Sequence, residues 1–180
     1  MKQLLILLTF ILTISSCSYY DEKQKQPGER ECRPFFFYDK IEHYRITVSE
    51  GKIWDLESNE NRTPEEDKYL EMLSRYFPDE LEDTMILKDL EKFGYKKALV
   101  SREKFDKIDE IFCSRYNRDD DKYSCLTVFR DILIFKKENE IIGVAKVCFN
   151  CGQNHIIGTN NETLYFGNNG DYDRLYELLY

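Results

Sequence analysis

The sequence is short of the residues on which most catalytic and metal sites depend. Its 180 residues include 2 histidines, 1 tryptophan and 3 methionines. It contains no Gly-x-Ser-x-Gly elbow, no His-Glu-x-x-His motif, no phosphate-binding glycine loop and no dinucleotide fingerprint. No recognised active-site motif is therefore present, and we predict no catalytic residue.

Positive charge is also in deficit, with 26 Lys and Arg against 34 Asp and Glu and a formal net charge of −8. A surface of this sign repels phosphate backbones, which argues against nucleic-acid binding as a main role. Hydrophobic residues make up 42% of the chain and aromatic residues 14%, which is enough for a packed core and too much for disorder. The length allows one domain with an appended segment.

The apolar run at the N-terminus, residues 4–14, is too short for a permanent transmembrane helix, which needs about 20 residues. With Lys2 before it, the run fits the hydrophobic region of a secretory signal peptide. The four residues Ile14-Ser15-Ser16-Cys17 resemble the lipobox of bacterial lipoproteins. That resemblance implies removal of residues 1–16 and acylation of Cys17, including palmitate. The alternative is an ordinary signal peptide with an incidental cysteine.

The lipobox resemblance also implies a location and a first partner. More than one acyl chain anchors a protein stably, so the lipid bilayer is the expected partner of Cys17. Ser18 follows the cysteine, and in the Gram-negative sorting rule this implies the outer membrane, with its periplasmic or surface face left open. Residues 17–31 include Pro27 and Gly28 and show no apolar periodicity, which predicts a flexible tether. A single domain is expected over residues 32–180.

Apolar periodicity predicts an α+β domain in which an antiparallel sheet packs with about four helices. The clearest helix start is Thr63-Pro64-Glu65-Glu66, a capping box, and Asp171 is expected to cap the last helix. Helices are also expected at 85–93, ended by Gly94, and after Ser101. Strands are expected at 41–48, 97–100, 123–137, 141–148, 155–158 and 164–166. The later strands would form a hairpin and meander.

Five cysteines remain beyond Cys17, an odd number, so disulfides alone cannot use them all within one chain. They are Cys32, Cys113, Cys125, Cys148 and Cys151. The turn of the hairpin decides what lies near Cys125. A two-residue loop at Glu138-Asn139 pairs Lys137 with Glu140 and places Cys125 opposite Gly152, whereas a three-residue loop places it opposite Cys151.

Three interpretations of this cysteine cluster compete. In the favoured one, Cys125 forms a structural disulfide with Cys148 or Cys151, or these two bond to each other. In the second, all three join His155 in a Cys₃His zinc site, with zinc as cofactor. The third is a redox Cys-x₂-Cys, although its first cysteine lacks the helix N-terminus that lowers a thiol pKa. A bridge from Cys113 to Cys125 would compete with the first.

The C-terminal third resembles a group of small uncharacterised bacterial proteins, many of them exported. The resemblance rests on Phe129–Phe135 followed by Val147-Cys148-Phe149-Asn150-Cys151. In that group the hairpin carries one Cys on its first strand and Cys-Phe-x-Cys on its second. The resemblance implies the hairpin and brings no activity with it.

These patterns together predict a membrane-anchored envelope lipoprotein that acts as a non-enzymatic binding or interaction module for an unknown ligand. The alternative is a metal-binding or redox envelope protein that uses the Cys-x₂-Cys cluster, and a third possibility is an inhibitor or immunity factor with one protein partner. Trp54 and the aromatic run 35–38 are expected to pack against the sheet. Arg130 and Asp131 are expected to form a cross-strand or sheet-edge pair.

Overall fold

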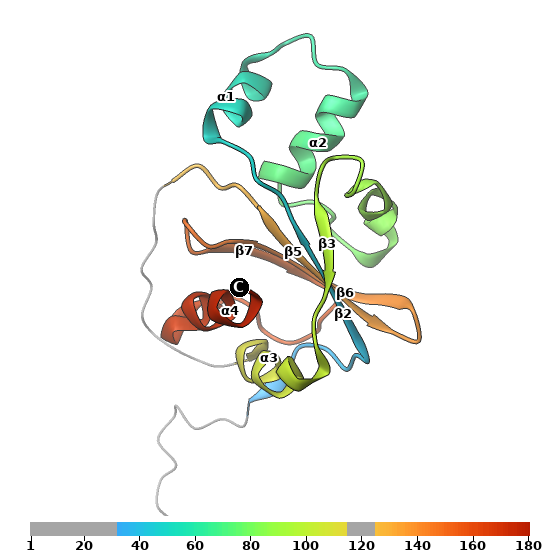
Figure 1. Ribbon diagram of the computed structural model, residues 1–180, viewed down its shortest axis with the longest axis vertical. Coiled ribbons are helices and arrows are strands. Elements are labelled where there is room, and N and C mark those ends of the chain that lie inside the picture. Colours follow the sequence, from blue (N-terminus) through green and yellow to red (C-terminus); the bar gives the residue numbers. More distant parts are fainter. Residues whose placement is uncertain (1–31, 115–124) are drawn as a thin grey trace, which may run out of the picture.

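A five-stranded antiparallel sheet organises residues 32–114 and 125–180, which are the residues that the computed structural model describes (Figure 1). Its strand order is β3-β2-β5-β6-β7, and the last three strands form a meander. A two-stranded ribbon pairs β1 (Arg33–Pro34) with β4 (Cys113–Ser114). The strands of the main sheet are β2 (Lys40–Arg45), β3 (Lys96–Leu99), β5 (Asp131–Lys137), β6 (Glu140–Cys148) and β7 (Gln153–Ile157). The predicted α+β class with an antiparallel sheet is confirmed.

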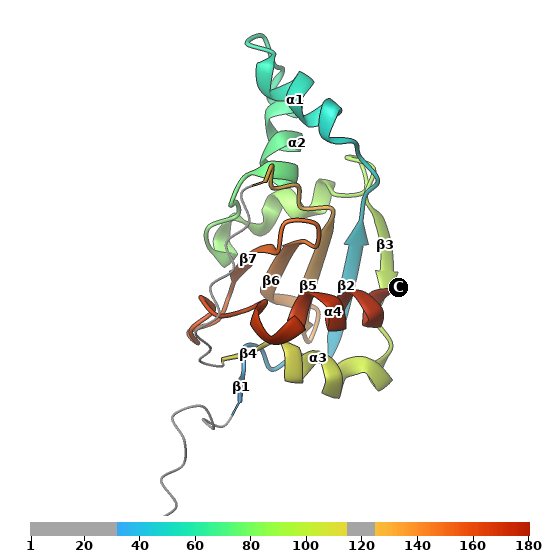
Figure 2. The same cartoon turned by 90° about the vertical axis from the view of Figure 1, so that its left-hand side faces the viewer.

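Four α-helices and three short 3₁₀ helices surround the sheet in the described parts of the chain. They are α1 (Glu50–Ser58), α2 (Pro64–Ser74), η1 (Leu81–Asp89), η2 (Arg102–Lys104), α3 (Phe105–Ile111), η3 (Asn168–Gly170) and α4 (Asp171–Leu179). Figure 1 shows α1 and α2 together at the top of the molecule and α3 and α4 together in its lower half. Figure 2 confirms that α1 and α2 extend beyond one end of the sheet.

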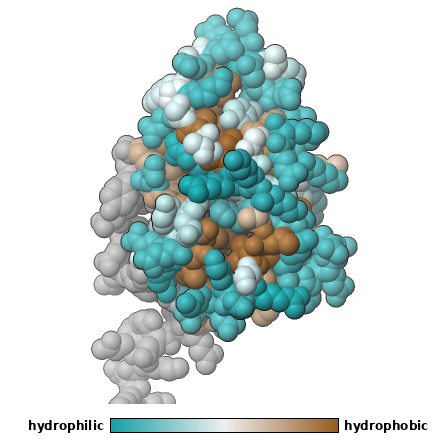
Figure 3. Space-filling model, in the orientation of Figure 1, coloured by the Kyte–Doolittle hydropathy of each residue, from teal (hydrophilic) through white to brown (hydrophobic). Residues whose placement is uncertain are grey.

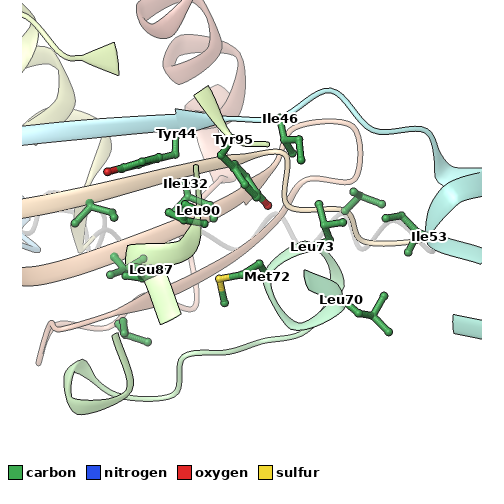
Figure 4. Packing of buried hydrophobic residues seen from close by; sticks show 14 of the residues in the cluster. Tyr44, Ile46, Ile53, Leu70, Met72, Leu73, Leu87, Leu90, Tyr95 and Ile132 are labelled. Carbon is green, nitrogen blue, oxygen red and sulfur yellow. The ribbon is translucent and has the colours of Figure 1, made fainter. Parts of the chain in front are cut away.

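Each face of the sheet has its own hydrophobic core. One core joins the sheet to α1, α2 and η1, and Figure 4 shows Leu87, Leu90 and Met72 packed near Ile132 of β5. The other joins the sheet to α3 and α4 through residues such as Ile108 and Leu175. Its aromatic members are Phe35, Phe36, Phe112, Phe135 and Phe166. Two buried faces explain why the first five residues of β5 are all buried and why the four that follow Asp131 are apolar.

The β5–β6 hairpin turns through the two-residue loop that the sequence predicts as one of its alternatives. Lys137 pairs with Glu140, and the two loop residues both have positive φ, which is the geometry of a type I′ turn. A bulge then shifts the register, so that Phe135 faces Gly143. Glycine is needed there because the ring of Phe36 lies where a side chain would begin, within 2.2 Å of the position of a Cβ atom.

The expected strand at 123–137 is wrong over residues 125–130, and residues 123–124 lie outside the described residues. β5 begins at Asp131, because the backbone before it bonds elsewhere instead of pairing with β6. The amide of Phe129 donates to the carbonyl of Leu73 at 2.7 Å, and the amide of Arg130 donates to Val128. The segment that carries Cys125 therefore leads from the cysteine cluster past the end of α2 and only then enters the sheet.

The sequence signals for helix ends were accurate where they depend on a few neighbouring residues. Thr63 and Glu66 form the complete capping box of α2, and Gly94 has a φ of +91°. The expected helix at 85–93 is instead η1 with following turns, and α1 was not predicted. Asp171 is the first residue of α4, with Gly170 at its N-cap, and residues 164–166 form no strand.

Figure 3 shows mostly hydrophilic surface with apolar side chains gathered near α4 and near the α1–α2 pair.

Candidate functional site

The predicted cysteine cluster is present, and two of its members are bonded to each other. Cys125 and Cys151 form a disulfide with Cα atoms 6.0 Å apart. Cys148 keeps a free, buried thiol whose sulfur accepts a hydrogen bond from the amide of Val128 at 3.4 Å. Of the pairings considered from the sequence, the structural disulfide between Cys125 and Cys151 is the one that forms.

A second disulfide joins Cys32 to Cys113, with Cα atoms 5.4 Å apart and a separation of 81 positions in sequence. It lies beside the β1–β4 ribbon, in which Pro34 pairs with Cys113. The bridge from Cys113 to Cys125 considered from the sequence is therefore wrong, since both residues have other partners. A crosslink around a loop of this length stabilises a fold by about 4 kcal/mol through the entropy of the unfolded chain.

The Cys₃His zinc site does not form. Two of its sulfurs are consumed in the Cys125–Cys151 disulfide, and His155 is engaged elsewhere, with its Nε2 atom 2.7 Å from the carbonyl oxygen of Pro78. Among the described residues, no group of three or more His, Cys, Asp or Glu side chains could hold a metal ion. Cys148 and Cys151 are not bonded to each other, and β7 rather than a helix follows them.

Lys146 of β6 is fully buried and occupies the space between the sheet and the end of α2. Its ammonium group donates to three backbone carbonyls, those of Glu71 at 2.9 Å, Arg75 at 2.7 Å and Phe77 at 2.8 Å. Burial lowers the pKa of Lys146 to about 7. The three acceptors match the three N–H groups of the ammonium form, so the side chain caps the C-terminal carbonyls of α2.

Glu42 of β2 is the buried centre of a basic cluster on the sheet. Its carboxylate is 1% exposed and accepts from Lys40 at 3.0 Å, Lys97 at 2.9 Å and Lys136 at 2.8 Å. The hydroxyl of Tyr44 donates to it at 3.3 Å. Burial would raise the pKa of Glu42, but the hydrogen bonds from Lys136, Lys97 and Lys40 outweigh that effect and lower it to about 2. We call Lys40, Lys97 and Lys136 the lysine triad.

A second buried carboxylate, Asp131, organises the opposite face of β2 and β5. Its Oδ1 atom lies 2.8 Å from Nε2 of His43 and also accepts a hydrogen bond from the hydroxyl of Tyr180. Burial is the main cause that raises the pKa of the Tyr180 hydroxyl, and the hydrogen bond to Asp131 raises this pKa further. The expected pairing of Asp131 with Arg130 is absent, because the Arg130 guanidinium donates to the carbonyl of Val48 at 3.1 Å.

Around Tyr180 lies an exposed aromatic surface. The ring of Tyr180 is 4.5 Å from that of Tyr176, and the guanidinium of Arg45 lies 3.9 Å from the Tyr180 ring centroid. Phe149 packs edge-on to Tyr176 at 5.3 Å. Although held in this way, Tyr176 and Tyr180 are 47% and 46% exposed. We call Tyr176, Tyr180, Phe149 and Arg45 the tyrosine surface.

Two aromatic side chains depart from the expectation that they pack against the sheet. Phe35 and Phe36 are buried, but Phe37 and Trp54 are largely exposed. Cys17, the lipidation site that the sequence predicts, and the whole of residues 1–31 lie outside the described residues. Within the described ranges, no helix combines the length and apolar character needed to span a bilayer.

The functional candidates that the sequence missed are the lysine triad and the tyrosine surface. One signal was available for each. Glu42 and Tyr44 alternate along the strand predicted at 41–48, and Lys40 continues the alternation just before it, which marks a polar row on one face. The last helix places Tyr176 four residues before Tyr180, which aligns their side chains on one side of the helix end. Neither signal identifies the partners that come from distant strands.

No protein family, curated protein or solved structure matches this chain.

Proposed function

We propose that this chain is a lipid-anchored binding module of the bacterial cell envelope, held at the outer membrane by acyl chains on Cys17. The signal-like residues 1–16, the lipobox-like Ile14–Cys17 and the polar segment before Cys32 support this location. Two disulfides in one domain are also typical of a protein that matures outside the cytoplasm. The module is non-enzymatic and acts by binding a protein partner.

The observation that carries the binding role is the rigid exposure of Tyr180. Its hydroxyl is fixed by buried Asp131 and its ring by the Arg45 guanidinium, so little side-chain entropy remains to be lost on binding. Tyrosine and arginine are enriched at the energetic centres of protein interfaces, where large amphipathic rings give contact area at low entropic cost. The tyrosine surface has this composition.

The same geometry supports a binding role over a catalytic one. His43 is buried, and one of its ring nitrogens is occupied by Asp131. Asp131 in turn holds Tyr180, so the carboxylate is used to position the exposed ring. His43 and Asp131 therefore act as positioning residues beneath the tyrosine surface.

Photo-crosslinking in cells tests the binding surface. Full-length protein carrying p-benzoylphenylalanine at Tyr176 should give one discrete crosslinked product, and adding Tyr180→Ala should remove most of it. The matched control carries the same photoreactive residue at Trp54, an aromatic on α1 at the far end of the domain that is at least as exposed as Tyr176. Equal products from both positions, or none from Tyr176, would reject the tyrosine surface as the binding site.

Metabolic labelling tests the anchor. Wild-type protein grown with radioactive palmitate should carry label and partition with membranes, whereas Cys17→Ala should lose the label completely, because the sulfur that carries the lipid is gone. Cys148→Ala is the matched control, since it removes another single cysteine, a free one, but should keep the label. Label retained by Cys17→Ala would overturn the lipid anchor.

A further inference from the structure

The lysine triad concentrates positive charge in a chain that is otherwise acidic. Lys136, Lys97 and Lys40 come from three adjacent strands, β5, β3 and β2, which lie side by side in the sheet (Figure 1). With the single negative charge of Glu42, the cluster keeps a net charge of +2, although the whole chain carries −8. Local charge of this sign attracts anions over the background of the chain.

Within the described residues, Glu42 is the one carboxylate that contacts the three lysines. Tyr44, the other polar side chain beside it, is a neutral hydroxyl, and Lys97 lies 5.5 Å from the centre of its ring. Like charges held this closely repel one another, so a second anion beside a cluster with two positive charges in excess would stabilise it electrostatically. A ligand with two negative charges would bring the net charge of the cluster to zero.

The ammonium groups are already gathered for such a ligand. Lys40 and Lys97 contact the same Oε1 atom, and Lys136 contacts Oε2, so the three nitrogens converge on one carboxylate. Each ammonium has three N–H donors, and one bond to Glu42 leaves others available. The lysine side chains remain 36%, 34% and 18% exposed for Lys40, Lys97 and Lys136, so these donors are reachable from solvent.

The chemistry that fits is an oxyanion with three equivalent acceptor oxygens and two negative charges. Charge-assisted hydrogen bonds from ammonium groups to phosphate oxygens are among the stronger polar contacts in proteins. We propose that the lysine triad binds a phosphate dianion on the outer side of its three ammonium groups, with Glu42 as the internal counter-ion that positions them. The phosphate can be free in solution or the headgroup of a phosphomonoester lipid, and this site is separate from the tyrosine surface.

Isothermal titration of the purified full-length protein in a non-ionic detergent tests the site with inorganic phosphate. We expect a dissociation constant of about 1 mM at neutral pH. Lys97→Gln should weaken binding about tenfold, since it removes one charged donor. Lys96→Gln is the matched control. Lys96 precedes Lys97 in β3, so its side chain lies on the opposite face of the sheet, and its substitution changes the net charge by the same amount. Sodium chloride at equal ionic strength should give no saturable signal.

A second variant and a second probe keep the inference testable. Glu42→Gln should bind phosphate about tenfold more tightly, because the internal competitor loses its charge. Micelles doped with phosphatidic acid, compared with phosphatidylcholine, should raise the Tm of wild type but not of Lys97→Gln if the phosphate belongs to a lipid. A response to inorganic phosphate or to phosphatidic acid supports the site and assigns its source. No response to either, or equal loss in Lys96→Gln and Lys97→Gln, overturns it.

Discussion

Replacing Lys146 with methionine is expected to lower the free energy of unfolding by about 3 to 5 kcal/mol. Methionine keeps the unbranched apolar stem and fills most of the same space, so packing changes little. The loss comes from the three part-buried backbone carbonyls of Glu71, Arg75 and Phe77, which lose their shared donor, although that of Glu71 keeps the amide of Arg75. An unsatisfied buried polar group costs about 1 to 3 kcal/mol. The acceptors here are backbone carbonyls, which no substitution can replace with apolar groups, so the cost cannot be avoided by a second mutation.

Urea unfolding followed by circular dichroism at neutral pH measures this effect. The matched control is Lys68→Met, which replaces an exposed lysine on α2, the helix that Lys146 caps, and should stay within about 0.5 kcal/mol of wild type. A Lys146→Met protein that loses less than about 1 kcal/mol would contradict the capping role. In that case water or a shifted α2 terminus must replace the ammonium as donor.

The parts of the fold that the sequence predicted well are those specified by a few consecutive residues. The capping box needs only Thr63 and Glu66, and the hairpin turn needs only Glu138 and Asn139, of which Asn139 is a residue type that favours positive φ. The α+β class followed from helical patterns early in the chain and strand patterns late. In each case the interactions that decide the structure lie within one turn of helix or one loop.

Predictions failed where a distant segment decides the local conformation. The residues before Asp131 have the composition of a strand. The amide of Phe129 instead donates its hydrogen bond to the carbonyl of Leu73 in α2, so this segment does not form the expected pairing with β6. Cys113 lies twelve residues before Cys125, yet it bonds to Cys32 because the β1–β4 ribbon holds them together. Spacing in the sequence carries no record of such contacts.

The polar clusters were out of reach for the same reason. Lys146 interrupts an apolar strand in the way that an exposed lysine would, and only the position of the α2 terminus makes it a buried cap. The lysine triad depends on the register of β2 against both β3 and β5, strands that start far apart in the sequence. A polar row could be predicted from alternation, but the convergence of three lysines on Glu42 could not.

Acid is expected to remove the stabilisation that Glu42 contributes, and this is the second large effect. The unfolded chain binds a proton at Glu42 near the ordinary pKa of 4.5, whereas the folded protein does so only at about 2. Between these values the unfolded state binds more protons, so stability falls as the pH falls. The contribution of Glu42 is therefore complete above about pH 4.5, declines from there to about pH 2 and is absent below. Its size is about 2 to 3 kcal/mol, since the partly exposed lysines are screened by solvent.

Comparing wild type with Glu42→Gln isolates this contribution from the other carboxyl groups. At pH 6 the variant should be less stable than wild type, and the difference in free energy of unfolding should shrink by about 2 to 3 kcal/mol as the pH is lowered to 2. Urea unfolding at a series of pH values measures it, with Glu103→Gln at an exposed position of η2 as the matched control. A difference between wild type and Glu42→Gln that stays constant across this range would contradict a lowered pKa. Three lysines on adjacent strands would then be held in place by packing and not by attraction to Glu42.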